Sequence, residues 1–174
     1  MSKELHEHIC SESVFEGVYN KYAKDLHDFL YYKYGAESNP NDITQDAFVK
    51  LWDNCKNVSF SKAKSYLFTV ANNMVLNAIK HKKVVLKFQQ TKPKSSTTET
   101  PEHVLEQKEF LKRYQVALSK LTEDQRVAFL MNKAEGKKHA EIAEFLGVTR
   151  KVVEYRIYTA FDKLKQELGD FKLK

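Results

Sequence analysis

Apolar residues recur at intervals of three or four along most of the chain, which is the spacing of an amphipathic α-helix. Over residues 13–33 they form one face made of Phe15, Val18, Tyr19, Tyr22, Leu26, Phe29 and Leu30. Asn41 or Asp42 can cap a second helix that runs through Trp52, and a third helix is expected over residues 64–83. No segment alternates in the manner of a β-strand, so the pattern predicts an all-α protein.

The helical period is lost in two segments. Residues 54–62 have no period and are expected to form a loop. Residues 92–101 are polar and contain two prolines, so residues 89–102 are expected to form a flexible linker. A long surface loop inside one domain is the alternative, although structureless loops of that length are uncommon. The sequence therefore predicts two small helical domains, residues 1–88 and 103–174, joined by a flexible linker.

Residues 140–157 have the pattern of a helix-turn-helix. The first helix is expected to bury Ile142 and Ala143, and Gly147 can adopt the left-handed conformation that ends it. Thr149 can then cap the next helix with its hydroxyl. That helix repeats apolar residues at Val153, Ile157, Ala160, Leu164 and Leu168. An ordinary helical hairpin could carry the same pattern, so the residues around it decide between the two interpretations.

The opposite face of this second helix is polar and aromatic. It presents Arg150, Lys151, Glu154, Tyr155 and Tyr158. Side chains of these types can reach phosphates and base edges in a DNA major groove. The face therefore favours DNA binding over a purely structural hairpin.

Composition restricts the remaining possibilities. The chain has 174 residues, of which 42% are hydrophobic, so it can build one domain or two small ones. Five glycines and three prolines are too few for the many turns of a sandwich or barrel. No apolar run is long enough for a membrane span, and residues 1–6 lack the apolar core of a signal peptide.

Positive charge is concentrated in one part of the chain. The net charge is +6 overall. Residues 54–98 contain nine lysines and no aspartate or glutamate, so the rest of the chain is net acidic. A solvated surface usually mixes both signs, whereas a one-sided block suits a polyanion. Nucleic acid is the partner that this distribution favours.

The sequence contains no recognisable catalytic constellation. It lacks a Gly-rich phosphate loop, an H-E-x-x-H motif and a nucleophile elbow, so neither an enzyme nor a cofactor is expected. His6, His8 and Cys10 lie close together, but a frayed terminus is a better interpretation than a metal site. No metal is therefore expected. Cys10 and Cys55 lack a C-x-x-C spacing and are interpreted as unpaired thiols in a reducing cytosol.

Three segments, taken in order, resemble one known family. They are residues 42–52 (Asp-Ile-Thr-Gln-Asp-Ala-Phe-Val-Lys-Leu-Trp), residues 65–73 (Ser-Tyr-Leu-Phe-Thr-Val-Ala-Asn-Asn) and residues 121–164. These segments are similar to those of the extracytoplasmic-function (ECF, group IV) sigma factors of bacterial RNA polymerase. Each segment is moderately specific, whereas all three in series are strongly specific. The resemblance covers nearly the whole chain.

The resemblance implies that residues 1–88 are sigma region 2 and residues 103–174 are sigma region 4. Such a protein directs core polymerase to specific promoters, recognises both promoter elements and melts the one near the start site. The implied partners are bacterial core RNA polymerase, promoter DNA and an anti-sigma factor, with no small-molecule substrate. The implied location is cytoplasmic, and the anti-sigma factor can hold the protein at the membrane.

The resemblance also assigns roles within region 2. Contacts to core polymerase are implied for Asp42, Gln45, Asp46, Leu51 and Trp52. Contacts to the melting element are implied for Phe60, Lys62, Lys64, Tyr66, Asn73, Lys80, Lys82 and Lys83. The chemistry fits, because aromatic stacking and lysine–phosphate contacts can offset the cost of unstacking a base. Trp52 could equally fill the core, and Phe60 could act as a hydrophobic staple.

In region 4 the resemblance implies that exposed residues contact the upstream promoter element, namely Arg150, Lys151, Glu154, Tyr155 and Arg156. Many family members carry a basic residue in place of Glu154 and a serine in place of Tyr155. Thr69 and Asn77 also stand where an arginine and an aspartate are common. Because a carboxylate near DNA favours a cytosine amino group over a phosphate, the promoter sequence cannot be carried over from the family.

Two other classes of function stay open at this point. A stand-alone helix-turn-helix repressor or activator would bind duplex DNA as a dimer. It would need neither the acid-free block nor the linker, and no heptad seam is evident. A helical protein-binding adaptor would carry its lysines as solvated surface. Salt-dependent DNA affinity separates the adaptor from the DNA-binding classes.

Overall fold

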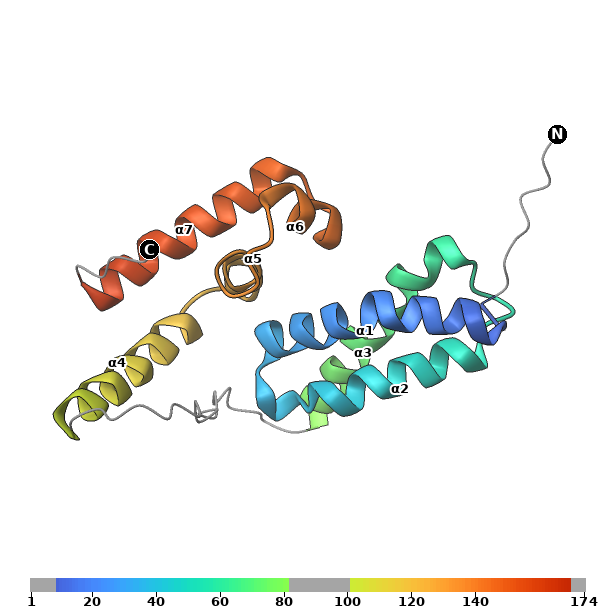
Figure 1. Cartoon of the computed structure of the whole chain (residues 1–174), viewed down its shortest axis with the longest axis horizontal. Helices are drawn as coiled ribbons and strands as arrows, with labels where there is room; N and C mark the ends of the chain where they lie inside the picture. Colours follow the sequence, from blue (N-terminus) through green and yellow to red (C-terminus); the bar gives the residue numbers. More distant parts are fainter. Residues whose placement is uncertain (1–8, 82–100, 170–174) are drawn as a thin grey trace. The chain divides into compact units, whose positions relative to one another are not determined.

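The computed structural model describes residues 9–81 and 101–169, and every regular element in these residues is helical. The chain divides into two compact units, Met1–Lys87 and Phe88–Lys174 (Figure 1). The predicted all-α fold with two helical domains is confirmed. The expected linker falls outside the described residues, apart from its last two positions, which already belong to a helix. None of the helices described is both long and apolar enough to cross a bilayer.

Three helices build unit 1: α1 (Glu12–Tyr34), α2 (Pro40–Asp53) and α3 (Ala63–His81). Two short 3₁₀ helices, η1 (Ala36–Ser38) and η2 (Phe60–Lys62), lie in the connections between them. Each of the long helices contacts the other two (Figure 1). Their facing stripes form one core, whose buried members include Val18, Leu26, Leu30, Ala47, Leu51, Leu67 and Ala71.

The start of α2 lies earlier than the sequence indicates. Gly35 ends α1 with a φ of 81°, and Asn39 precedes α2 with a left-handed φ of 50°. Pro40 is the first helical residue, a position that suits proline because its φ is already helical and its missing N–H would have no helical partner. Asn41 and Asp42 lie inside the first turn, so the expectation that either residue caps α2 is wrong.

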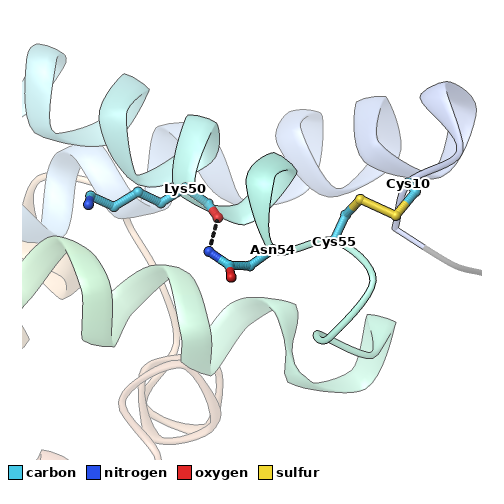
Figure 2. Close-up of a disulfide and its surroundings, with 4 residues drawn as sticks. All are labelled: Cys10, Lys50, Asn54 and Cys55. Carbon is cyan, nitrogen blue, oxygen red and sulfur yellow. Dashed lines mark hydrogen bonds between the residues drawn. A yellow bond between two sulfur atoms is a disulfide. The ribbon is translucent and has the colours of Figure 1, made fainter.

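A disulfide joins Cys10 to Cys55, with the sulfur atoms 2.05 Å and the Cα atoms 5.1 Å apart (Figure 2). Cys10 lies just before α1, and Cys55 lies just after α2. Because the two helices are joined by a short turn and run in opposite directions, the start of α1 meets the end of α2. The expectation of two unpaired thiols is wrong, since the helical hairpin brings together cysteines 45 positions apart.

Four helices build unit 2: α4 (Pro101–Ser119), α5 (Glu123–Lys133), α6 (His139–Leu146) and α7 (Arg150–Leu168). Helix α7 contacts each of the other three. Leu168, at the end of the predicted apolar stripe, is only half-buried. The other members of the stripe are buried as the spacing predicts, namely Val153, Ile157, Ala160 and Leu164.

The core of unit 2 also contains a charged side chain. Arg126 of α5 is almost fully buried, and its Nη1 donates to the carbonyl oxygens of Leu118 and Leu121 at 3.5 and 3.2 Å. These carbonyls lie where the helical hydrogen bonding of α4 ends. Burial lowers the pKa of Arg126, and the Glu123 carboxylate partly opposes that shift. The guanidinium group therefore ties the end of α4 to α5.

We expect Arg126→Ala to lower the free energy of unfolding by about 2–4 kcal/mol, because two carbonyls lose a charged donor and a cavity forms. Arg113→Ala is the matched control. Arg113 also donates to a backbone carbonyl, that of Leu168 at 3.4 Å, but it is exposed, so its loss should cost about 0.5 kcal/mol or less. Urea unfolding followed by circular dichroism measures both costs, and equal costs would contradict the role given to Arg126.

Candidate nucleic-acid interface

The turn between α6 and α7 is defined by a hydrogen bond at the end of α6 and a cap at the start of α7. Gly147 ends α6 at a left-handed φ of 67°, and the N–H of Val148 donates to the Ala143 carbonyl oxygen at 3.0 Å. Thr149 caps α7, since its Oγ1 accepts a hydrogen bond from the N–H of Val152 at 3.4 Å. The predicted turn and cap are both confirmed. Together they set the direction in which α7 leaves the turn.

The face of α7 opposite its buried stripe is open to solvent and largely aromatic. Tyr155 and Tyr158 are 69% and 68% exposed. Val152 and Lys151 are exposed on the same helix. Large apolar side chains gathered on one exposed face are typical of a binding surface, and the adjacent lysine makes an anionic partner favourable.

Two arginines on α7 are already paired within unit 2. Arg150 Nε donates to Glu154 Oε1 at 2.7 Å, and His139 Nδ1 lies 3.6 Å from the same oxygen. Arg156 Nη2 donates to Asp124 Oδ2 at 2.6 Å, and the Arg156 side chain is only 20% exposed. Arg156 is thus less exposed than the sequence indicates. Both guanidinium groups are held in position by a carboxylate.

A hollow of about 580 Å³ opens beside this face. It is lined from three helices by Asn132, Lys133, His139, Glu154, Tyr155, Ile157, Tyr158 and Phe161. Of these residues, the sequence marked Glu154, Tyr155 and Tyr158 as surface positions of a DNA-binding helix. Lys133 and His139 were missed because only the packing of α5 and α6 against α7 brings them there.

In unit 1, two aromatic residues predicted to contact the melting element occupy different surroundings. Phe60, at the start of η2, is exposed and is not buried as a hydrophobic staple would be. Tyr66 of α3 is half-buried, and its hydroxyl donates to the Lys50 carbonyl oxygen at 3.3 Å. Phe60 is therefore free to stack on a base, whereas the hydroxyl of Tyr66 is engaged with α2.

The described polar residues among those predicted for the same element lie along η2 and α3. Lys62 and Asn73 are exposed, and Lys64 is half-buried. Lys80 belongs to α3. Lys82 and Lys83 lie outside the described residues. The structure thus places Lys62, Lys64 and Asn73 on the connection into α3 and on α3 itself.

The residues predicted to contact core polymerase divide between the surface and the core. Asp42, Gln45 and Asp46 are exposed on α2. Leu51 is fully buried among the core residues of unit 1. Leu51 therefore packs α2 against the core. Its side chain is not exposed, so it cannot make the direct contact with polymerase that the sequence predicted.

The Trp52 side chain is partly exposed and partly packed against α1. It is 44% exposed, and its ring lies edge-on to Phe15 of α1 with centroids 5.0 Å apart. Tyr19 and Val49 are exposed on the same two helices, and the Tyr19 ring lies 4.9 Å from that of Phe48. We call the exposed side chains Tyr19, Val49 and Trp52 the α1–α2 apolar surface. The sequence analysis placed Tyr19 on the apolar face of the first helix, where it proves to be exposed, and gave no indication of Val49.

No cluster of three or more His, Cys, Asp or Glu side chains suited to a metal occurs within residues 9–81 and 101–169. His6 and His8 lie outside these residues. Cys10, the third member of the group noted in the sequence, is bonded to Cys55, and a disulfide sulfur is not the thiolate that metals bind.

Comparisons with known proteins assign the chain to a family. The family model described as Sigma-70 region 2 matches residues 18–84, and the one described as Sigma-70, region 4 matches residues 111–164, together more than half of the chain. The chain belongs to the sigma-70 family. The sigma factor is therefore a DNA-binding transcription initiation factor that works with RNA polymerase, and the family is not one of catalysts.

The two matches fall one in each unit of the sigma factor. The region 2 match contains most of α1 and all of α2, η2 and α3, and the region 4 match runs from within α4 to near the end of α7. The 1.8 Å structure of the RsbN–BldN complex is similar to 87% of this chain, over 89% of its own, with 16% identity and a TM-score of 0.32. A likeness that weak supports no conclusion here. No curated protein matches the sigma factor.

We expect Thr149→Ala to destabilise unit 2 by about 1 kcal/mol, because the first turn of α7 loses its only side-chain cap. Thr149→Ser is the matched control, since it keeps the hydroxyl and should retain most of the stability. Thermal unfolding measures both variants. A Ser variant as unstable as the Ala variant would show that the methyl group, and not the cap, matters at this position.

Proposed function

We propose that this sigma factor is of the ECF type (group IV), which recognises both promoter elements and melts the one near the start site. The order and spacing of the two family matches carry the proposal. Only residues 85–110 lie between them, a stretch too short to fold as a further packed domain. Region 2 and region 4 would then act from the two units with no folded domain between them.

Recognition of the upstream element is assigned to α7, through Arg150, Lys151, Glu154, Tyr155 and Arg156. Lys151 and Tyr155 are exposed and available without any rearrangement. Arg150 uses its Nε on Glu154, which leaves its other N–H groups for a phosphate or a guanine edge. Arg156 would contact a phosphate while it keeps its hydrogen bond to Asp124.

Melting is assigned to Phe60, Lys62, Lys64, Tyr66, Asn73 and Lys80 on η2 and α3, and to Lys82 and Lys83, which follow in the sequence outside the described residues. Extruding a base costs a few kcal/mol, and stacking on an aromatic ring contributes about 1–3 kcal/mol per base. The exposed ring of Phe60 supports this role. Lys62 lies two positions later in η2 and is exposed, so it can contact a phosphate.

Binding to bacterial core RNA polymerase is assigned to α2, through Asp42, Gln45, Asp46 and Trp52, with Leu51 buried beneath them. The α1–α2 apolar surface supports this assignment, because exposed aromatic side chains with rings held by neighbours are typical of interface anchors. An anti-sigma factor and a cytoplasmic location, with the anti-sigma factor able to hold the protein at the membrane, belong to the same proposal.

Size-exclusion chromatography of the full chain with core polymerase, followed by transcription from a pool of promoter fragments, tests the proposal. We expect co-elution and discrete start sites. Trp52→Ala should weaken co-elution, whereas Tyr155→Ala should leave it intact and serves as the matched aromatic control. Tight binding of duplex DNA by the chain alone, without co-elution, would favour the stand-alone repressor.

We expect the exposed apolar surface of Tyr155 to contact a thymine methyl group in the upstream element. Replacing that thymine with deoxyuridine removes only the methyl group and should lower transcription about fourfold, since burying one such carbon contributes about 0.8 kcal/mol. Tyr155→Ala should abolish this sensitivity to the methyl group. Tyr155→Phe keeps the ring and should retain it. A methyl effect that is unchanged in the Ala variant would place Tyr155 away from the bases.

A further inference from the structure

The Cys10–Cys55 disulfide lies next to the end of α2 (Figure 2). Asn54 closes α2, because both its backbone N–H and its side-chain Nδ2 donate to the Lys50 carbonyl oxygen, at 3.2 and 3.0 Å. The N–H of Cys55 then donates to the Trp52 carbonyl oxygen at 3.1 Å. The sulfur of Cys55 is thus attached to the helix end that carries Trp52.

The other half of the bond fixes the chain just before α1. Ile9 is fully buried in the core of unit 1, and Cys10 packs partly buried against that core. Only the two residues Ile9 and Cys10 are described ahead of Ser11 and α1. The disulfide therefore holds this short segment to the end of α2.

The bond also anchors residues 54–62, the connection from α2 to α3. Cys55 and Val58 are its buried members. The N–H of Asn57 donates to the Asn54 carbonyl oxygen at 2.9 Å. This hydrogen bond closes a turn at the start of the connection. Phe60 and Lys62, assigned above to the melting element, follow on the exposed part of the same connection.

The two cysteine residues differ in exposure. Cys55 is 9% exposed, whereas Cys10 is only partly buried. A reducing thiolate can therefore attack at Cys10 Sγ, with the Cys55 thiolate leaving and taking up a proton. The second thiol of a dithiol then releases Cys10 as a thiol. The dithiol becomes a disulfide, and two electrons and two protons pass to the protein.

We propose that Cys10–Cys55 is a thiol–disulfide exchange site that regulates promoter opening. The disulfide state holds residues 54–62 in place for the extruded base, and reduction by a dithiol releases this anchor. A low-molecular-weight disulfide restores the bond, being reduced to two thiols as Cys10 and Cys55 lose two electrons and two protons. A preorganised loop spends less conformational entropy when it binds, so the disulfide state is the more active one. This regulatory part rests on the proposed function.

The test equilibrates the full chain in reduced or oxidised dithiothreitol and removes the reagent. Free thiols are counted by alkylation and mass spectrometry, and thermal unfolding is recorded. Opening of one promoter by core polymerase is then followed by permanganate footprinting. We expect no free thiol, a higher unfolding temperature and several-fold more open complex for the oxidised chain. The matched controls are Cys10→Ser, which keeps the size of the side chain, and Cys10→Ser/Cys55→Ala, which leaves no thiol.

The controls separate the disulfide from any redox response of the polymerase. Neither variant should respond to dithiothreitol, and both should open the promoter as the reduced chain does. Two free thiols under oxidising conditions would overturn the exchange site. Equal opening in both redox states, or an equal response in the variants, would overturn the regulation. An absence of opening by every form would overturn the proposed function together with its regulation, while the thiol count would still decide the exchange site.

Discussion

The buried stripe of α7 is the contact on which the binding face of unit 2 depends. Val153, Ile157, Ala160 and Leu164 pack against the other helices of the unit, so α7 cannot rotate about its axis without exposing apolar surface to water. Once that rotation is fixed, Tyr155 must face solvent. The binding face is thus a consequence of core packing, and no contact among the surface residues is needed to create it.

Each unit has a connection between helix ends in addition to its hydrophobic core. In unit 1 the Cys10–Cys55 bond closes a hairpin of two helices. In unit 2 the buried Arg126 hydrogen-bonds carbonyls at the end of α4 and just after it. These connections act where helices are weakest, because backbone groups at helix ends lack partners within the helix.

Three of the side chains proposed to bind are held before any partner arrives. Glu154 holds Arg150, Asp124 holds Arg156, and the ring of Phe15 packs against Trp52. Holding a long side chain in one rotamer reduces the entropy lost on binding. It also limits which partner geometry fits, so these intramolecular pairs contribute to specificity as well as to affinity.

The sequence alone determined the helices, the buried stripe of α7, the stop at Gly147 and the cap at Thr149. These features depend on neighbours within about four positions, because helical hydrogen bonds and side-chain periodicity act at that range. Only the tertiary structure decided that Cys10 meets Cys55, that Arg156 pairs with Asp124, and that Leu51 is buried. Such contacts join residues tens of positions apart or depend on which helix face another helix covers, and no local pattern encodes that packing.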